Sequence, residues 1–124
     1  MKHRLTILVT IAIVILSTIP VPEVPELQDV PFLDKWVHFV MYGALTFAMY
    51  LDRKLSHANT DKTFIIAAFV YPSLLGGLME LFQAYCTTCR SGEWLDFYAD
   101  TFGAFLATII SLSLWKIVKI SVRK

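Results

Sequence analysis

Several side chains that can exchange protons or bind ions lie at regular helical spacing in this sequence. Asp34, His38 and Tyr42 are each four residues apart, which places them on one face of a helix. Asp96 and Asp100 have the same spacing further along the chain. Carboxylates and imidazoles are the usual groups for general acid–base chemistry, and both are also ligands for divalent metals. The spacing therefore predicts two helix faces that can carry acid–base chemistry or hold a metal.

A third polar face lies between the other two along the chain. Gly76, Glu80 and Gln83 share one side of a helix, and Glu80 lies well inside an otherwise apolar stretch. A charged side chain in the hydrocarbon core of a membrane costs at least about 2.5–3.5 kcal/mol. We therefore expect Glu80 to face protein rather than lipid, with His38 or Arg90 as its partner.

The polar residues of these faces, together with two nearby cations, form the candidate site. The candidates for binding are Asp34, Lys35, His38, Tyr42, Glu80, Gln83, Arg90, Asp96 and Asp100, and the candidates for catalysis are His38, Glu80, Asp96 and Asp100. Arg90 is suited to pair with a phosphate or a carboxylate. No G-x-S-x-G, H-E-x-x-H or P-loop pattern is present, so no nucleophile is named and the question of enzymatic activity stays open.

Four apolar segments must position these side chains. The chain is 56% hydrophobic and 17% charged, against about 25% charged residues in soluble domains. A membrane crossing needs about 20 apolar residues, and a shorter helix is accommodated by local thinning of the bilayer. A water-soluble bundle is the competing interpretation, but residues 7–16 and 102–114 lack the charged stripe of a soluble amphipathic helix. We predict an all-α domain over 1–124, an antiparallel bundle of four transmembrane helices at about 5–19, 36–51, 64–86 and 97–118.

Lysines and arginines are distributed unevenly between the connections. Loops on the cytoplasmic side of a membrane are enriched in these residues. They gather at the two termini and in the middle connection, as Lys2, Arg4, Arg53, Lys54, Lys62, Lys116, Lys119, Arg123 and Lys124. The other two connections hold Lys35, Arg90 and most of the acids. We therefore predict a multi-pass protein of the bacterial plasma (inner) membrane with both termini cytoplasmic and with residues 20–35 and 87–96 facing outward.

The first apolar segment allows two interpretations. Lys2, His3 and Arg4 give it the positively charged start of a secretory signal peptide. No A-x-A-like cleavage pattern follows Ile15, because Ser17 and Thr18 lead directly into Ile19 and Pro20. An uncleaved helix is therefore favoured.

Prolines and small residues mark connections and contacts between helices. The first outward connection is predicted to be extended and non-helical, since proline fixes φ and removes a backbone donor, and it contains Pro20, Pro22, Pro25 and Pro31. Pro72, inside the third segment, predicts a kink and a freed carbonyl at Ala68. Close helix–helix contact is predicted at small residues, namely Gly76, Gly77, Gly103, Ala107 and Ser111.

The two cysteines, Cys86 and Cys89, form a C-x-x-C pair at the outward end of the third segment. Disulfides persist in oxidising compartments outside the cytoplasm. A structural metal site would need further thiol or imidazole ligands, and there is no second cysteine pair. The pair is therefore a candidate disulfide or two unreactive thiols, and thiol–disulfide exchange is the sharper alternative.

The order of the polar motifs resembles the VanZ-like family of small integral membrane proteins. The resemblance spans about 20–107 and is carried by Asp34-Lys35-x-x-His38, Glu80-x-x-Gln83 and Arg90-x5-Asp96-x3-Asp100-x2-Gly103. The chain departs from the family at Asp100, where Asn is usual, at Ala107, where a second Gly is frequent, and in its cysteine pair. The family is named for a protein linked to resistance to the glycopeptide teicoplanin. The resemblance thus implies a cell-envelope membrane protein and a weak link to antibiotic resistance, without a defined reaction.

Three functions fit these features. The first is binding or modification of a lipid or glycan head group of the cell envelope, at a single outward-opening pocket in which His38, Glu80, Gln83, Arg90, Asp96 and Asp100 converge. A divalent metal held by oxygen and imidazole ligands fits the same residues. The second is a non-enzymatic membrane scaffold with a polar core, and the third is thiol–disulfide exchange. The expected partners are the bilayer and a lipid-linked envelope molecule. Nucleic acid is not expected, because no basic groove pattern is present, and the oligomeric state stays open.

Overall fold

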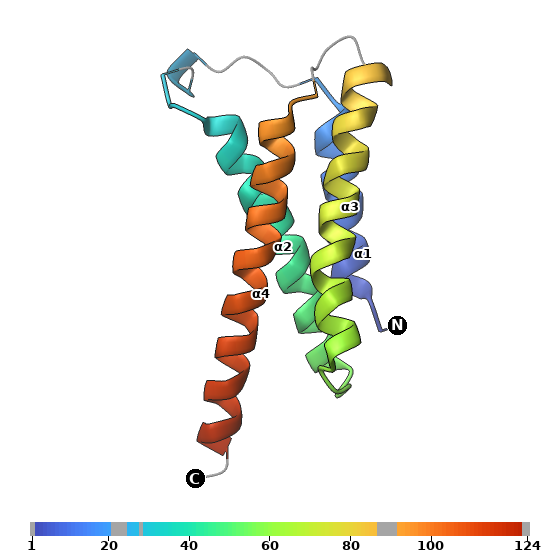
Figure 1. The fold of residues 1–124 in the computed structure, drawn as a ribbon, viewed down its shortest axis with the longest axis vertical. Helices are drawn as coiled ribbons and strands as arrows, with labels where there is room; N and C mark the ends of the chain where they lie inside the picture. Colours follow the sequence, from blue (N-terminus) through green and yellow to red (C-terminus); the bar gives the residue numbers. More distant parts are fainter. Residues whose placement is uncertain (1, 21–24, 28, 87–91, 123–124) are drawn as a thin grey trace.

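The computed structural model describes residues 2–20, 25–27, 29–86 and 92–122. Within these residues the chain forms four α-helices and one 3-10 turn, with no strand. The helices are α1 (Arg4–Thr18), α2 (Leu33–Leu55), α3 (Lys62–Cys86) and α4 (Trp94–Val122), and the 3-10 turn is Pro25–Leu27. They run alternately up and down along the long axis, with both termini toward the same end (Figure 1). The prediction of an all-helical protein is confirmed.

Each helix begins or ends at a slightly different residue from the one that hydropathy predicts. Helix α2 was predicted over 36–51 and extends from Leu33 to Leu55. Asp34 lies in its first turn, and Arg53 and Lys54 lie in its last. At these positions the charges interact favourably with the helix dipole and stabilise the helix. Hydropathy marks only the apolar part of a helix, so it does not include charged residues in the first and last turns. Likewise α4 begins at Trp94, with Asp96 in its first turn, rather than at residue 97.

The proline-rich connection was predicted to be extended without helix, and this is wrong at one point. Residues Pro25–Leu27 form a 3-10 turn. Proline is accommodated at the first position of a helical turn, because the missing N–H group would have no partner there. Residues 21–24 and 28 of the same connection lie outside the described residues.

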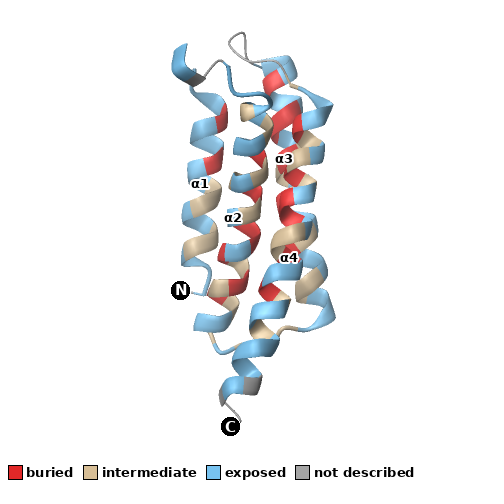
Figure 2. Ribbon diagram, turned by 90° about the vertical axis from the view of Figure 1, so that its left-hand side faces the viewer, coloured by how far each residue is buried: buried red, intermediate tan, exposed pale blue. Residues whose placement is uncertain are grey.

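Two helices, α3 and α4, are long and apolar enough to cross a membrane by length and composition, and α1 is a shorter apolar helix of 15 residues. Large apolar side chains are exposed on all four helices, among them Leu8, Val40, Leu78 and Ile117. Figure 2 shows buried residues where helices face one another and exposed residues on the outside. Extended apolar surface of this kind is unusual on a soluble protein and supports association with a membrane.

Helices α2 and α4 approach each other closely through small residues. A Cβ atom added at Gly43 would lie 3.4 Å from the carbonyl oxygen of Gly103 and 3.9 Å from the Cβ atom of Ala107. A Cβ atom added at Gly103 would collide with the carbonyl oxygen of Phe39. The small residues thus let the two backbones touch, as the sequence predicts for Gly103 and Ala107. This contact fixes the position of the first turns of α4 against those of α2.

The carbonyl that Pro72 leaves without its helical donor finds a partner on another helix. Pro72 lies inside α3, and the hydroxyl of Thr46 donates a hydrogen bond to the carbonyl oxygen of Ala68 at 3.2 Å. The freed carbonyl was predicted from sequence, but its donor was not. The bond joins α2 to α3 near the middle of the bundle.

The two ends of the bundle differ in their chemistry. We call the end where α1 and α3 finish and α2 and α4 begin the polar end, and the other end the basic end. At the basic end, the Asp52 carboxylate accepts hydrogen bonds from the backbone N–H groups of Leu5 and Thr6 at 3.2 and 2.8 Å. It also accepts one from the Thr6 hydroxyl at 2.8 Å. Asp52 thereby caps the start of α1, a role that the sequence analysis missed.

Candidate functional site

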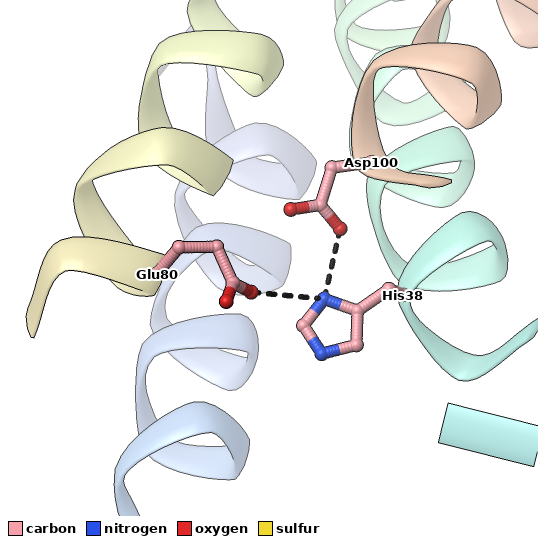
Figure 3. Close-up of side chains that lie close together, drawn as sticks. All are labelled: His38, Glu80 and Asp100. Atoms are coloured by element: carbon pink, nitrogen blue, oxygen red, sulfur yellow. Dashed lines mark hydrogen bonds and ion pairs between the residues drawn. The ribbon is translucent and has the colours of Figure 1, made fainter. Parts of the chain in front are cut away.

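Three helices bring an imidazole and two carboxylates together at the polar end. His38 comes from α2, Glu80 from α3 and Asp100 from α4, and their side chains point toward one another (Figure 3). The Nδ1 atom of His38 lies 2.9 Å from Oδ1 of Asp100 and 3.7 Å from Oε1 of Glu80. On the other side of the ring, Nε2 lies 3.7 Å from Oδ2 of Asp96. We call His38, Glu80, Asp96 and Asp100 the polar cluster; they are the four residues that the sequence nominated for catalysis.

The polar cluster is almost completely enclosed by protein. Asp100 is 0% exposed, Asp96 5%, Glu80 6% and His38 7%. Buried charges are costly unless they are paired, protonated or bound to a metal. Three carboxylates surround one imidazole here, so the cluster has more acids than its own base can neutralise.

Some buried oxygen atoms of the site have no hydrogen-bond partner within the described part of the chain. They include Oε1 of Glu80, Oδ2 of Asp100 and the hydroxyl of Tyr42. The Tyr42 side chain is 0% exposed, and its ring lies nearly parallel to that of His38, with 6.3 Å between centroids and 12° between planes. Buried polar atoms nearly always have a partner in native structures. Three such atoms around one histidine therefore need partners that the described residues do not supply.

The position of Asp100 depends on a glycine in the neighbouring helix. A Cβ atom added at Gly76 would lie 2.5 Å from Oδ2 and 2.9 Å from Cβ of Asp100. Both distances are too short for real atoms, so only glycine leaves space for this carboxylate between α3 and α4. Gly76 was predicted as a packing residue, and the structure places it directly against the polar cluster.

Glu80 is held by the chain that leads into α4. Its Oε2 atom accepts a hydrogen bond from the backbone N–H of Glu93 at 2.8 Å. A Cβ atom added at Gly92 would collide with the carbonyl oxygen of Glu80, so the absence of a side chain there permits this approach. His38 was one of two predicted partners of Glu80 and is present at 3.7 Å. The other, Arg90, lies outside the described residues.

Lys35 connects the two exposed acids at the rim of the site, Asp34 and Glu93, to the polar cluster. Its ammonium nitrogen lies 2.7 Å from Asp34, 2.9 Å from Glu93 and 3.3 Å from Asp96. Asp34 lies ahead of the apolar part of α2, and its hydrogen bond to Lys35 lowers the pKa of its carboxyl group below the usual value. Lys35 therefore neutralises the rim acids and reaches only Asp96 among the cluster residues.

Two predicted residues that the structure describes, Gln83 and Cys86, lie outside this arrangement. The Gln83 side chain is buried and donates from Nε2 to the backbone carbonyl of Ser17 in α1 at 2.9 Å, so this bond joins α3 to α1. Cys86 is exposed at the end of α3. Cys89, like Arg90, lies outside the described residues, so the predicted disulfide stays a prediction.

Glu93 is the residue of the site that sequence reasoning missed. It contacts Lys35 through its carboxylate and Glu80 through its backbone N–H. It lies outside the apolar segments, where a carboxylate is exposed to water without a free-energy penalty and therefore gives no sign of a site. Its place immediately before α4, whose first turn carries Asp96, was the available signal.

Two groups of side chains at the polar end have the geometry to hold a metal ion. In the first, His38, Glu80 and Asp100 each offer one ligand atom within 4.8 Å of the others, and all three are buried. In the second, Asp34, Glu93 and Asp96 do the same, but the first two are exposed. The Lys35 ammonium already contacts all three acids of the second group. The first group is therefore the better candidate metal centre.

An apolar groove between α3 and α4 leads to the site. It encloses about 340 Å³ and is lined in part by Phe69, Leu78, Gly77, Leu81 and Trp94. A smaller pocket of about 100 Å³, lined in part by Glu80, Gly92 and Glu93, shares Gly77, Leu81 and Trp94 with the groove. The apolar groove thus adjoins a pocket lined by the acidic residues Glu80 and Glu93 at the polar end.

No known protein family matches this chain, and neither a curated protein nor a solved structure is significantly similar to it. The resemblance to the VanZ-like family therefore stays a prediction from the sequence motifs. Any function has to be inferred from the groove, the polar cluster and the atoms within it that have no partner.

Proposed function

We propose that this chain is a four-span membrane protein of the VanZ-like type whose polar end binds the head group of a cell-envelope lipid or lipid-linked glycan. The observation that carries the proposal is the apolar groove between α3 and α4, which ends at a pocket lined by Glu80 and Glu93. A lipid has a matching arrangement, because its apolar chain is followed by a polar head group as the apolar groove is followed by the acidic pocket. The lipid chain occupies the groove, and the head group reaches the pocket.

The proposal requires the chain to cross the membrane four times, with the polar end facing outward. Helices α3 and α4 have the length and composition of membrane spans, and α1 and α2 pack against them with alternating direction. The excess of Lys and Arg at the basic end supports a cytoplasmic location for that end. The polar end then faces outward from the bacterial inner membrane. A reporter active only outside the cytoplasm should give a signal when fused near Glu26 and none when fused at Lys124, and the reverse result would contradict this orientation.

Aromatic side chains support the proposed depth of the pocket. Tyr85 and Trp94 both line it, and they are 84% and 72% exposed. Tyrosine and tryptophan are enriched at the level of lipid head groups, because their rings are amphipathic. The two exposed aromatic residues at the pocket support its location at the depth of the lipid head groups.

The pocket borders a group that can exchange protons, because Glu80 lines it and lies 3.7 Å from His38. His38 is hydrogen-bonded to Asp100 through Nδ1, and its Nε2 atom faces Asp96. An imidazole held between carboxylates is a common general acid–base arrangement. Binding is the function that the groove supports, and modification of the head group is a further step for which His38 is the candidate.

A scaffold without a ligand is the second candidate. The observation that favours it is the direct bond between His38 and Asp100, which ties α2 to α4. Interhelical hydrogen bonds of this kind contribute about 0.6 kcal/mol on average in membranes. A scaffold needs its polar atoms to be satisfied, however, and Glu80 and Asp100 each retain an unpartnered oxygen within the described part of the chain.

Photo-crosslinking separates the two candidates. The full chain is reconstituted in vesicles that contain phosphatidylethanolamine, phosphatidylglycerol or a glycosyl diacylglycerol with a diazirine in the acyl chain. We expect labelling of α3 and α4 to depend on the head group and to fall several-fold in Leu78→Trp, which fills the groove. Leu8→Trp is the matched control, because Leu8 is a similarly exposed leucine on α1 (65% against 62%). Equal labelling by all three lipids, unchanged in Leu78→Trp, would leave only the scaffold.

A further inference from the structure

We infer that His38, Glu80 and Asp100 form a binding site for one divalent transition-metal ion, of the Mn²⁺ or Zn²⁺ type. The inference deepens the proposed function, since the ion would lie next to the head-group pocket, but the site itself needs only these three side chains. They come from α2, α3 and α4 and converge on a common point (Figure 3).

The spacing of the donor atoms fits a metal ion closely. Bonds of about 2.0–2.2 Å in a tetrahedral arrangement place neighbouring ligand atoms about 3.3 Å apart. The Nδ1 atom of His38 lies 2.9 Å from the Asp100 oxygen and 3.7 Å from the Glu80 oxygen, so the two distances fall on either side of that value. Small side-chain rotations are enough to receive an ion, and the ion replaces the proton that His38 and Asp100 now share.

The unpartnered atoms supply a separate reason for a cation. Oε1 of Glu80 and Oδ2 of Asp100 are buried acceptors without a donor in the described part of the chain. The Tyr42 hydroxyl is fully buried beneath the His38 ring and also lacks a partner. A cation with a bound water would provide a positive charge for the carboxylates and a partner for the phenol.

The surroundings of His38 resemble those of a metal ligand. If Nδ1 binds the ion, Nε2 carries the proton and faces the Asp96 carboxylate, 3.7 Å away. Histidine ligands usually direct their second ring nitrogen to a carboxylate, which fixes the tautomer and the ring orientation. Asp96 in turn contacts Lys35, so its charge is balanced outside the metal site.

The donor set indicates which ion is bound. One imidazole with two carboxylates suits Zn²⁺ or Mn²⁺ better than Ca²⁺, which prefers oxygen ligands alone. Three protein ligands leave a coordination position free, as in catalytic zinc sites. Glu80 also lines the 100 Å³ pocket at the end of the groove, so the ion would lie directly behind the wall of that pocket. The ion would thus allow an acidic site to hold a phosphate or carboxylate.

The test measures metal binding to the full chain in detergent, without added lipid. Metal is removed from the protein with a chelator, and the protein is then titrated with Mn²⁺ or Zn²⁺ alone. The number of bound ions per chain is measured by inductively coupled plasma mass spectrometry. We expect one ion per chain, nitrogen coupling to bound Mn²⁺ in pulsed electron paramagnetic resonance, and at least a tenfold loss of affinity in His38→Asn. The matched control is His57→Asn, because His57 is exposed at the basic end and has a positive φ of 51° that asparagine tolerates.

A second variant keeps the test decisive if His38→Asn does not fold. Asp100→Asn preserves the shape of the side chain and removes its charge, and it should also lose the ion. Absence of stoichiometric binding to the folded wild-type protein, or equal binding to wild type and Asp100→Asn, would overturn the metal site. Because no lipid is present, either result leaves the head-group proposal to be decided by crosslinking.

Discussion

Two buried aspartates at opposite ends of the bundle have similar exposure and opposite roles. Asp52 is 5% exposed and accepts three hydrogen bonds from the first turn of α1. Asp100 is 0% exposed, has one hydrogen bond to His38, and keeps its second oxygen without a partner among the described residues. Burial of a carboxylate alone therefore does not identify a site. A buried carboxylate marks a site when its bonding capacity is left unused.

Removal of Asp52 should give the largest loss of stability. Asp52→Ala leaves two backbone N–H groups and the Thr6 hydroxyl without their acceptor. Loss of a helix cap and of charge-assisted hydrogen bonds should together lower the free energy of unfolding by about 3 kcal/mol. Thermal unfolding in detergent measures this loss, and metal binding in the remaining folded fraction should be unchanged. A stable Asp52→Ala protein would break the comparison.

Gly76→Ala should damage both stability and the site. The added Cβ atom would meet Oδ2 of Asp100 at 2.5 Å, so the carboxylate or the helix must move. Overpacking of this kind typically costs about 1–3 kcal/mol, and displacement of Asp100 should also abolish metal binding. Gly77→Ala is the matched control, since its Cβ atom would meet only the Phe97 ring, at 3.3 Å. Equal effects at the two glycines would show that the position of Asp100 is not the cause.

Asp100→Asn should separate function from folding. The amide has the shape of the carboxylate and keeps a hydrogen-bonding group opposite His38, while one buried charge is removed. We expect the free energy of unfolding to change by about 1 kcal/mol at most, with loss of the bound ion. Severe unfolding would place Asp100 in the same class as Asp52.

Lys35→Gln should have the smallest effect on stability. Lys35 pairs with acids at the rim, two of which are exposed, and such ion pairs contribute about 0.5 kcal/mol. The same change removes a positive charge beside Asp96, so affinity for a divalent cation should rise a few-fold. A metal titration of wild type and Lys35→Gln at equal ionic strength measures this change. A fall in affinity would instead make Lys35 part of the support of the metal site.

The apolar segments of the sequence were sufficient to locate the four helices to within a few residues, and the spacing of polar residues located one polar face on each of α2, α3 and α4. A polar residue every third or fourth position inside an apolar stretch can be satisfied only on one side of a helix. His38, Glu80 and Asp100 could therefore be nominated before any contact was known. The same local reasoning located the small residues at Gly103 and Ala107, and the carbonyl at Ala68 that Pro72 leaves free, because these depend on residue type and position alone.

The tertiary structure alone decided which polar residues meet. The rotation of each helix about its axis is set by its closest contacts, such as that of Gly103 with the Phe39 backbone. That rotation turns Glu80 toward His38 and Gln83 toward Ser17, although Glu80 and Gln83 share one face of α3. The partners of Glu80 and Asp52 are largely backbone N–H groups. Every residue except proline has such a group, so the sequence carries no signal for which one will donate.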